Sequence, residues 1–327
     1  MPDVTEARAA ARAEGPRPDS GRPDRPRAGS VLSESDRLVR ASTPSSLLHG
    51  FRDDMAAIWT YRELLDQLVR KELKVKYKES VLGFFWSMAR PMLQIIIYYV
   101  AFTIFLGSQQ PAFAIFVFTG LLAWGFFTDV VGGCTGSVVG NGALIKKTSF
   151  PREILPLSVV GAALVNFAFQ LVVLALALAV AALAGFRVVP NLDLLLVPLA
   201  LAVAVVWATA VGLVLAGATV YLRDIQYLVD VMLLAGFWLS PVVYPITYAV
   251  DNLAKRGHGT LLEIYLANPM TNVIATFQRA FYTMGEQFTF QGALLPRLLV
   301  LLLTGLVALW ASQRLFARLR GKFAQEL

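Results

Sequence analysis

The stretch VVGAALVNFAFQLVVLALALAVAAL, residues 159–183, contains no charged side chain. A helix needs about 20 apolar residues to cross the ~30 Å hydrocarbon core of a membrane. A run of this length and composition is therefore typical of a transmembrane helix, and it decides the fold class. With the apolar runs on either side of it, one of which is shorter, the chain has six predicted spans: 91–106, 112–131, 159–183, 194–221, 227–244 and 294–316.

The composition of the whole chain agrees with an all-α polytopic membrane protein. Of its 327 residues, 57% are hydrophobic and only 16% are charged, and the mean hydropathy is +0.61. Soluble domains carry about 25% charged residues. This composition excludes collagen, a disulfide scaffold and a disordered regulator. The single cysteine, Cys134, cannot form an intrachain disulfide.

The basic residues indicate how the spans are oriented. Residues 1–90 hold 16 of the 29 lysines and arginines, many of them in the juxtamembrane stretch 70–78. Beyond residue 90, placing the N-terminus inside leaves 8 basic residues in inner segments and 5 in outer segments. Cytoplasmic loops are enriched in Lys and Arg, so both termini are predicted to be cytoplasmic. This topology also explains the net charge of +7 without a nucleic acid partner.

Two regions precede the predicted six-span domain of residues 91–327. Residues 1–50 are rich in Ala, Arg, Pro and Ser without an apolar run, which predicts a disordered cytoplasmic tail. Within residues 51–90, apolar side chains recur on one helical face at Ile58, Tyr61, Leu64, Leu65, Leu68 and Val69. We expect this amphipathic helix to lie in the membrane plane, with basic groups at the lipid headgroups. A soluble helix that caps a small cytoplasmic domain is the alternative.

Motifs for chemistry are missing from the sequence. It has no G-x-x-x-x-G-K-[ST] loop for nucleotide phosphates and no His, Cys or carboxylate cluster with metal-ligand spacing. Two carboxylates, Asp129 and Asp230, fall within predicted spans, where charges are costly and often functional. We therefore expect no catalytic residue, metal or cofactor in this chain.

Small residues recur at four-residue steps in two of the predicted helices. One series is Gly132, Gly136 and Gly140, and the other is Ala208, Gly212 and Ala216. Such spacing lets helices approach closely. The default interpretation is a contact within the subunit, and a dimer seam is the alternative.

Several segments carry a resemblance to a known family. In chain order they are YRELL at 61–65, KVKYK at 74–78, VLGFFW at 81–86, GLLAW at 120–124, LIKKTSFPREILP at 144–156, YLRD at 221–224, SPVVYP at 240–245 and NP at 268–269. Over residues 58–320 the chain resembles the permease subunit of ABC exporters for lipid-linked polysaccharide, O-antigen or teichoic acid, and it is similar to actinobacterial galactan exporters. One departure is Ala123, which stands where the family often has Pro before the Trp.

The resemblance implies an export function in the bacterial plasma (inner) membrane. It implies a homodimer of six-span subunits that moves lipid-linked polysaccharide outward, with re-entrant outer helices before the last span. Two separate cytoplasmic ATPase subunits would bind ATP and Mg²⁺. A membrane-embedded enzyme acting on lipid-linked sugars is one alternative, and it would need a carboxylate or metal site. An ion-coupled transporter is another, and it would usually show inverted repeats and buried charges.

Candidate residues for ATPase coupling lie in the segment 141–153 and after the fourth span. They are Leu144, Ile145, Lys146, Lys147, Phe150, Pro151, Arg152, Glu153, Arg223 and Asp224. Leu144, Ile145 and Phe150 offer an apolar edge that can dock in a groove of the ATPase. The nearby cations can pair with acids there, or they only enforce topology. A plain helix-end salt bridge is the alternative for Arg223 and Asp224.

Two further sets of residues are candidates for the export route. Aromatic rings that can stack on sugars of the substrate path are Tyr98, Tyr99, Phe102, Trp124, Phe126, Phe127, Phe167, Phe169, Phe237 and Trp238. The alternative for these rings is core packing or a lipid-facing belt, and we expect fewer than half to line the path. Prolines break the outer segment 240–290, which predicts an outer gate with Ser240, Pro241, Tyr244, Pro245, Asn268 and Pro269. A folded cap on the outer surface is the alternative.

Overall fold

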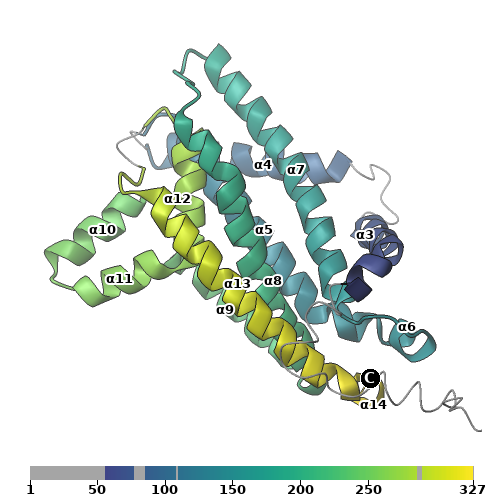
Figure 1. Ribbon diagram of the computed structural model, residues 1–327. Coiled ribbons are helices and arrows are strands. Elements are labelled where there is room, and N and C mark those ends of the chain that lie inside the picture. The colour runs from purple at the N-terminus through teal and green to yellow at the C-terminus, as the bar shows by residue number, and fades with distance from the viewer. Residues whose placement is uncertain (1–55, 77–84, 108–109, 286–288, 327) are drawn as a thin grey trace, which may run out of the picture. The chain divides into compact units, whose positions relative to one another are not determined.

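The computed structural model describes residues 56–76, 85–107, 110–285 and 289–326, which form helices and turns without a strand (Figure 1). The predicted tail of residues 1–50 lies outside the described residues. The helices are α3 (Arg62–Lys76), α4 (Phe85–Tyr98), the π-helix η2 (Tyr99–Phe105), α5 (Phe113–Gly140), α6 (Gly142–Lys147), α7 (Ile154–Leu183), the 3₁₀-helix η3 (Leu192–Leu196), α8 (Val197–Tyr221), α9 (Ile225–Leu239), α10 (Ile246–Lys255), α11 (Gly259–Ala267), α12 (Pro269–Phe281), α13 (Leu294–Leu319), η5 (Arg320–Lys322) and α14 (Phe323–Glu326).

Within the described residues, five helical segments are long and apolar enough to cross a membrane. They are Met88–Phe105, Phe113–Gly140, Ile154–Leu183, Leu192–Tyr221 and Leu294–Leu319. The all-helical fold and these five predicted spans are thereby confirmed. The sixth predicted span, 227–244, corresponds to α9, which has 15 residues and is about 22 Å long at 1.5 Å per residue. It ends at Leu239 because Pro241 follows, and a residue before proline favours extended backbone, as Ser240 has with ψ 150°.

Helix α5 is the most buried of the five long helices. It contacts α7, α8, α9 and α12, and its buried side chains form much of the main apolar core. In Figure 1, α5, α7, α8 and α13 run alongside one another. The ends of these helices define two ends of the bundle. We call the one with α6 and the C-terminus the α6 end, and the one with η3 and the start of α13 the opposite end.

Helix α3 packs against α7 near the α6 end. Its apolar side chains Leu64, Leu68 and Val69 turn inward, whereas Asp66 and Arg70 are exposed and form an ion pair of 2.8 Å with each other. The approach to α7 is close, because a Cβ added to Gly161 would lie only 2.7 Å from Val69 Cγ2.

Helix α12 is almost completely buried between α5 and α8. It begins where Asn268 Oδ1 accepts a hydrogen bond from the backbone N–H of Met270, with Pro269 in the first turn, where its missing N–H costs nothing. Its C-terminal end is held at the opposite end of the bundle, where Tyr282 Oη donates to Pro111 O over 2.6 Å. The preceding α10 and α11 are largely exposed and project to one side in Figure 1.

Candidate functional site

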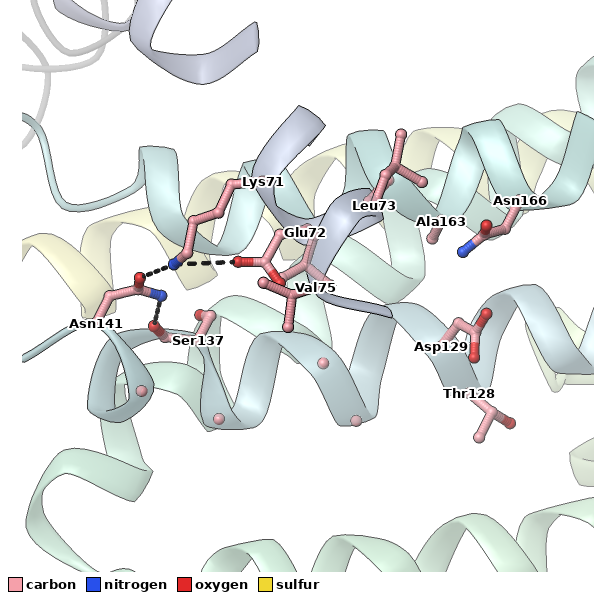
Figure 2. Close-up of a pocket in the computed structure, with 16 residues that line it drawn as sticks. Lys71, Glu72, Leu73, Val75, Thr128, Asp129, Ser137, Asn141, Ala163 and Asn166 are labelled. Atoms are coloured by element: carbon pink, nitrogen blue, oxygen red, sulfur yellow. Dashed lines mark hydrogen bonds and ion pairs between the residues drawn. The ribbon is translucent and has the colours of Figure 1, made fainter. Parts of the chain in front are cut away.

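A cavity of about 620 Å³ opens between α3, α5 and α7. Figure 2 shows its two polar ends. At the α6 end, Lys71 Nζ donates to Asn141 Oδ1 over 2.5 Å, and Asn141 Nδ2 donates to Ser137 O over 2.8 Å. Asn141 separates α5 from α6, so this hydrogen-bonded pair joins the cavity wall on α3 to the start of the segment 141–153.

One wall of the cavity is a glycine face of α5. Gly132, Gly136 and Gly140 line it, and a Cβ added to Gly132 or Gly140 would have no heavy atom within 4 Å. The default expectation of an internal helix contact is therefore wrong for this series. It holds for the second series, because a Cβ added to Gly212 would lie 2.8 Å from Cys134 Cβ on α5.

A second cavity, of about 990 Å³, lies between α4, α5, α7 and α9. It shares Thr128, Asp129 and Asn166 with the first cavity, so the two adjoin near the middle of α5. Its other polar side chains are those of Arg90, Gln94, Gln170 and Asp230. Arg90 and Asp230 are exposed in the single chain, and polar groups among apolar helices are costly in a membrane, which makes them functional candidates.

Only two of the ten predicted path aromatics, Trp124 and Phe237, line these cavities. Phe126 and Phe167 are buried in the core, where their ring centroids lie 5.5 Å apart. Tyr98 and Phe102 pack beside Phe113 and Tyr282 in a separate cluster and line neither cavity. Exposed rings are those of Tyr99 and Trp238, and Phe127 and Phe169 are half-buried.

The predicted coupling segment has an exposed side and a buried side. Lys146 and Lys147 are exposed, whereas Ile145 is only 6% exposed. Ile145 belongs to a cluster of buried apolar residues that we call the α6 cluster: Leu68, Val138, Ile145, Ile154, Leu155, Leu213, Ala216, Val220, Phe316 and Phe323. Ile145→Asp would place a charge in this buried cluster and destabilise the fold. A loss of transport in that variant would therefore not distinguish a coupling defect from a folding defect.

Arg152 and Glu153 contact the C-terminal segment. Glu153 is 2% exposed and accepts a hydrogen bond from Arg320 Nη1 over 2.6 Å, while Arg152 Nη1 donates to Arg320 O. Burial and the nearby charge of Arg320 lower the pKa of Arg152, although an arginine stays protonated in a protein. Both side chains are thus engaged within the subunit. Arg223 and Asp224, in the turn between α8 and α9, have exposed side chains.

The predicted outer-gate residues lie around α12. Pro241 O accepts a hydrogen bond from Gln278 Nε2 over 2.8 Å, which ties the segment after α9 to α12. Ser240 and Pro245 are buried and Tyr244 is half-buried, while Asn268 and Pro269 begin α12. Sequence reasoning missed Gln278, and it missed the cavity amides of Gln94, Asn166 and Gln170. The feature of the sequence that could have identified these residues is an amide side chain within an apolar run.

Among the residues that the structure describes, no group of three or more His, Cys, Asp or Glu is placed to hold a metal ion. An apolar helical bundle with adjoining cavities lined by polar side chains is typical of a membrane transport protein. The chain belongs to the ABC-2 type transporter family, which matches residues 63–282. It is an integral membrane protein, and its resemblance to transporter permeases is confirmed.

Several relatives are O-antigen export system permeases named RfbA. The protein from Myxococcus xanthus is 32% identical over 271 residues, which cover 83% of this chain and 97% of the relative. Two proteins from Klebsiella pneumoniae are each 27% identical over 266 residues, which cover 81% of this chain and 95% of each relative. These similarities place the chain among transporter permeases.

Proposed function

We propose that this chain is the channel-forming permease subunit of an ATP-driven exporter. Its cargo is a lipid-linked polysaccharide, which moves from the cytoplasm to the outer side of the bacterial plasma membrane. The observation that carries the proposal is the 32% identity to an O-antigen export permease over 97% of that protein. The polar cavities support it, because amide and carboxylate side chains beside Trp124 and Phe237 suit hydroxyl groups and sugar faces.

The topology of the proposed permease has six passes, with both termini cytoplasmic. Helix α9 is short, but it begins directly after α8 at the α6 end. Val242, which follows α9, lies against the half of α5 that is farther from the α6 end, because a Cβ added to Gly120 would lie 2.8 Å from Val242 O. The segment 225–242 therefore passes most of the bundle. The exposed Trp59 and the charged outer side of α3 suit an interfacial position at the α6 end.

The partners are a second copy of this chain and two cytoplasmic ATPase subunits, which would bind the ATP and Mg²⁺. Lys146 and Lys147 are the cations of the coupling segment that are exposed for pairing with acidic residues of an ATPase. Arg223 and Asp224 are exposed at the same end of the bundle. The second candidate function, an enzyme on lipid-linked sugars, has no specific observation in its favour.

The function is tested with purified protein in lipid vesicles. The chain is reconstituted with a candidate ATPase subunit, identified by co-purification with it, and lipid-linked glycan of defined structure is supplied outside, at the ATPase side. We expect ATP-dependent movement of the glycan to the vesicle lumen, measured by protection from an added glycosidase. Protection that is the same without ATP would contradict the proposal.

A re-entrant hairpin formed by α11 and α12 is proposed as the outer gate. The C-terminal end of α12 lies near the opposite end of the bundle, where Arg279 forms a 2.8 Å ion pair with Asp193 before α8. The turn between the two helices leads into the fully buried Thr271. Irregular backbone at such depth is tolerated only where protein or a wet cavity surrounds it.

Single cysteines test this gate in a Cys134→Ser background. With a membrane-impermeant thiol reagent added outside, Arg256→Cys and Thr283→Cys are expected to label, because they flank the hairpin. Thr271→Cys is expected to be protected at rest and to label faster during ATP turnover. Equal labelling of all three positions would indicate a cap on the outer surface instead.

A further inference from the structure

The C-terminal segment folds back onto the α6 end of the bundle. Phe323 has 0% of its side chain exposed, and its ring lies 5.4 Å from that of Phe316 and 6.3 Å from that of Tyr221. Tyr221 Oη also donates to Leu319 O over 2.9 Å. The end of α8 and the end of α13 are thus joined by the residues that follow α13.

The C-terminal segment also contacts the coupling segment 141–153 through charged groups. Arg320 pairs with the buried Glu153, and Arg320 O accepts a hydrogen bond from Arg152. The guanidinium of Arg152 also lies 5.8 Å from the centre of the Phe323 ring, within range of a cation–π interaction. A buried carboxylate needs a cationic partner, so this pairing strongly favours one arrangement of the two segments.

Helix α6 of the coupling segment is too short to be stable by itself. Helix α6 has six residues, and isolated helices shorter than about 12 residues are marginal in water. Its placement therefore depends on tertiary contacts. On its buried side these are Ile145 within the α6 cluster, which includes Phe323, and the contact of α6 with α14.

We propose that Glu153, Arg320 and Phe323 are positioning residues that hold the coupling segment in the geometry an ATPase subunit recognises. Docking of the C-terminal segment behind α6 keeps Lys146 and Lys147 presented on its exposed side. The inference rests on the proposed function for the identity of the partner. The docking of the C-terminal segment itself is tested without any partner.

The first measurement reports the position of α6 in the full chain in lipid nanodiscs. A nitroxide is attached at Lys147→Cys in the Cys134→Ser background, and its mobility is read by electron paramagnetic resonance. Arg320→Ala and Phe323→Ala are expected to increase the mobility, and Arg320→Lys is expected to restore most of the ordering. Arg318→Ala is the matched control, because Arg318 is exposed in the last turn of α13. Equal mobility in Arg320→Ala and Arg318→Ala would overturn the inference.

The second measurement is the affinity for the candidate ATPase subunit used in the vesicle experiment. We expect binding to be about tenfold weaker for Arg320→Ala and close to wild type for Arg320→Lys and Arg318→Ala. A lower unfolding temperature for Arg320→Ala with unchanged mobility and affinity would mean a purely structural role, against the inference. If the wild-type chain binds no such ATPase, the proposed function fails, whereas the mobility result still decides whether the segment is docked.

Discussion

Gly132→Trp is expected to stop export while leaving the protein folded. Gly132 lines the first cavity, and no heavy atom lies within 4 Å of the position a Cβ would take. An indole there would project from the glycine face into the cavity, so it would occupy space that the proposed cargo needs. We expect export in vesicles to fall by about tenfold or more, equivalent to about 1.4 kcal/mol on the barrier to transport.

The control for this experiment is Val180→Trp. Val180 is 66% exposed near the C-terminal end of α7 and lines neither cavity. We expect this variant to export normally. Wild-type export by Gly132→Trp, with both variants inserted at equal levels, would show that the cargo does not pass the glycine face.

Gly212→Ala and Gly132→Ala are expected to change stability in opposite directions. Both place one methyl group in a long helix. At position 212 the methyl would lie 2.8 Å from Cys134 Cβ, and overpacking of this kind costs about 1–3 kcal/mol. At position 132 it meets open space, and replacing a helical glycine by alanine gains up to about 1 kcal/mol.

Thermal unfolding of the two variants in the same detergent measures this difference. The unfolding temperature should fall for Gly212→Ala and rise or stay constant for Gly132→Ala. Shifts of the same sign in both would mean that the two glycine positions have similar surroundings, against the packing described for α5 and α8.

The long helices were predictable because their signal is the local sequence. Residues 159–183 form most of α7, and their end is marked by Gly185, whose φ of 89° suits glycine. The helix starts earlier than predicted, at Ile154, since Pro156 lies in its first turn and proline is tolerated there. Helix α5 likewise continues beyond the predicted Val131 to Gly140.

The cavities and the α6 end were not predictable in the same way. The two glycine-containing series have the same spacing, and only the neighbouring helices decide that one is packed and the other open. The pairing of Glu153 with Arg320 joins residues 167 positions apart, and no periodicity in the sequence encodes it. Ile145 was expected, with Leu144 and Phe150, on an apolar edge that docks in a groove of the ATPase, but partners from other helices bury it within the subunit.

The hydrogen bond between Lys71 and Asn141 connects the wall of the first cavity to the coupling segment. Asn141 ends α5 and begins α6, and Lys71 belongs to the cavity wall on α3. A second link, from Tyr61 Oη to Ser149 O at 3.5 Å, connects the residue before α3 to a later part of the segment 141–153. In an exporter driven through α6, these two hydrogen bonds would carry a displacement of the coupling segment to the rim of the first cavity.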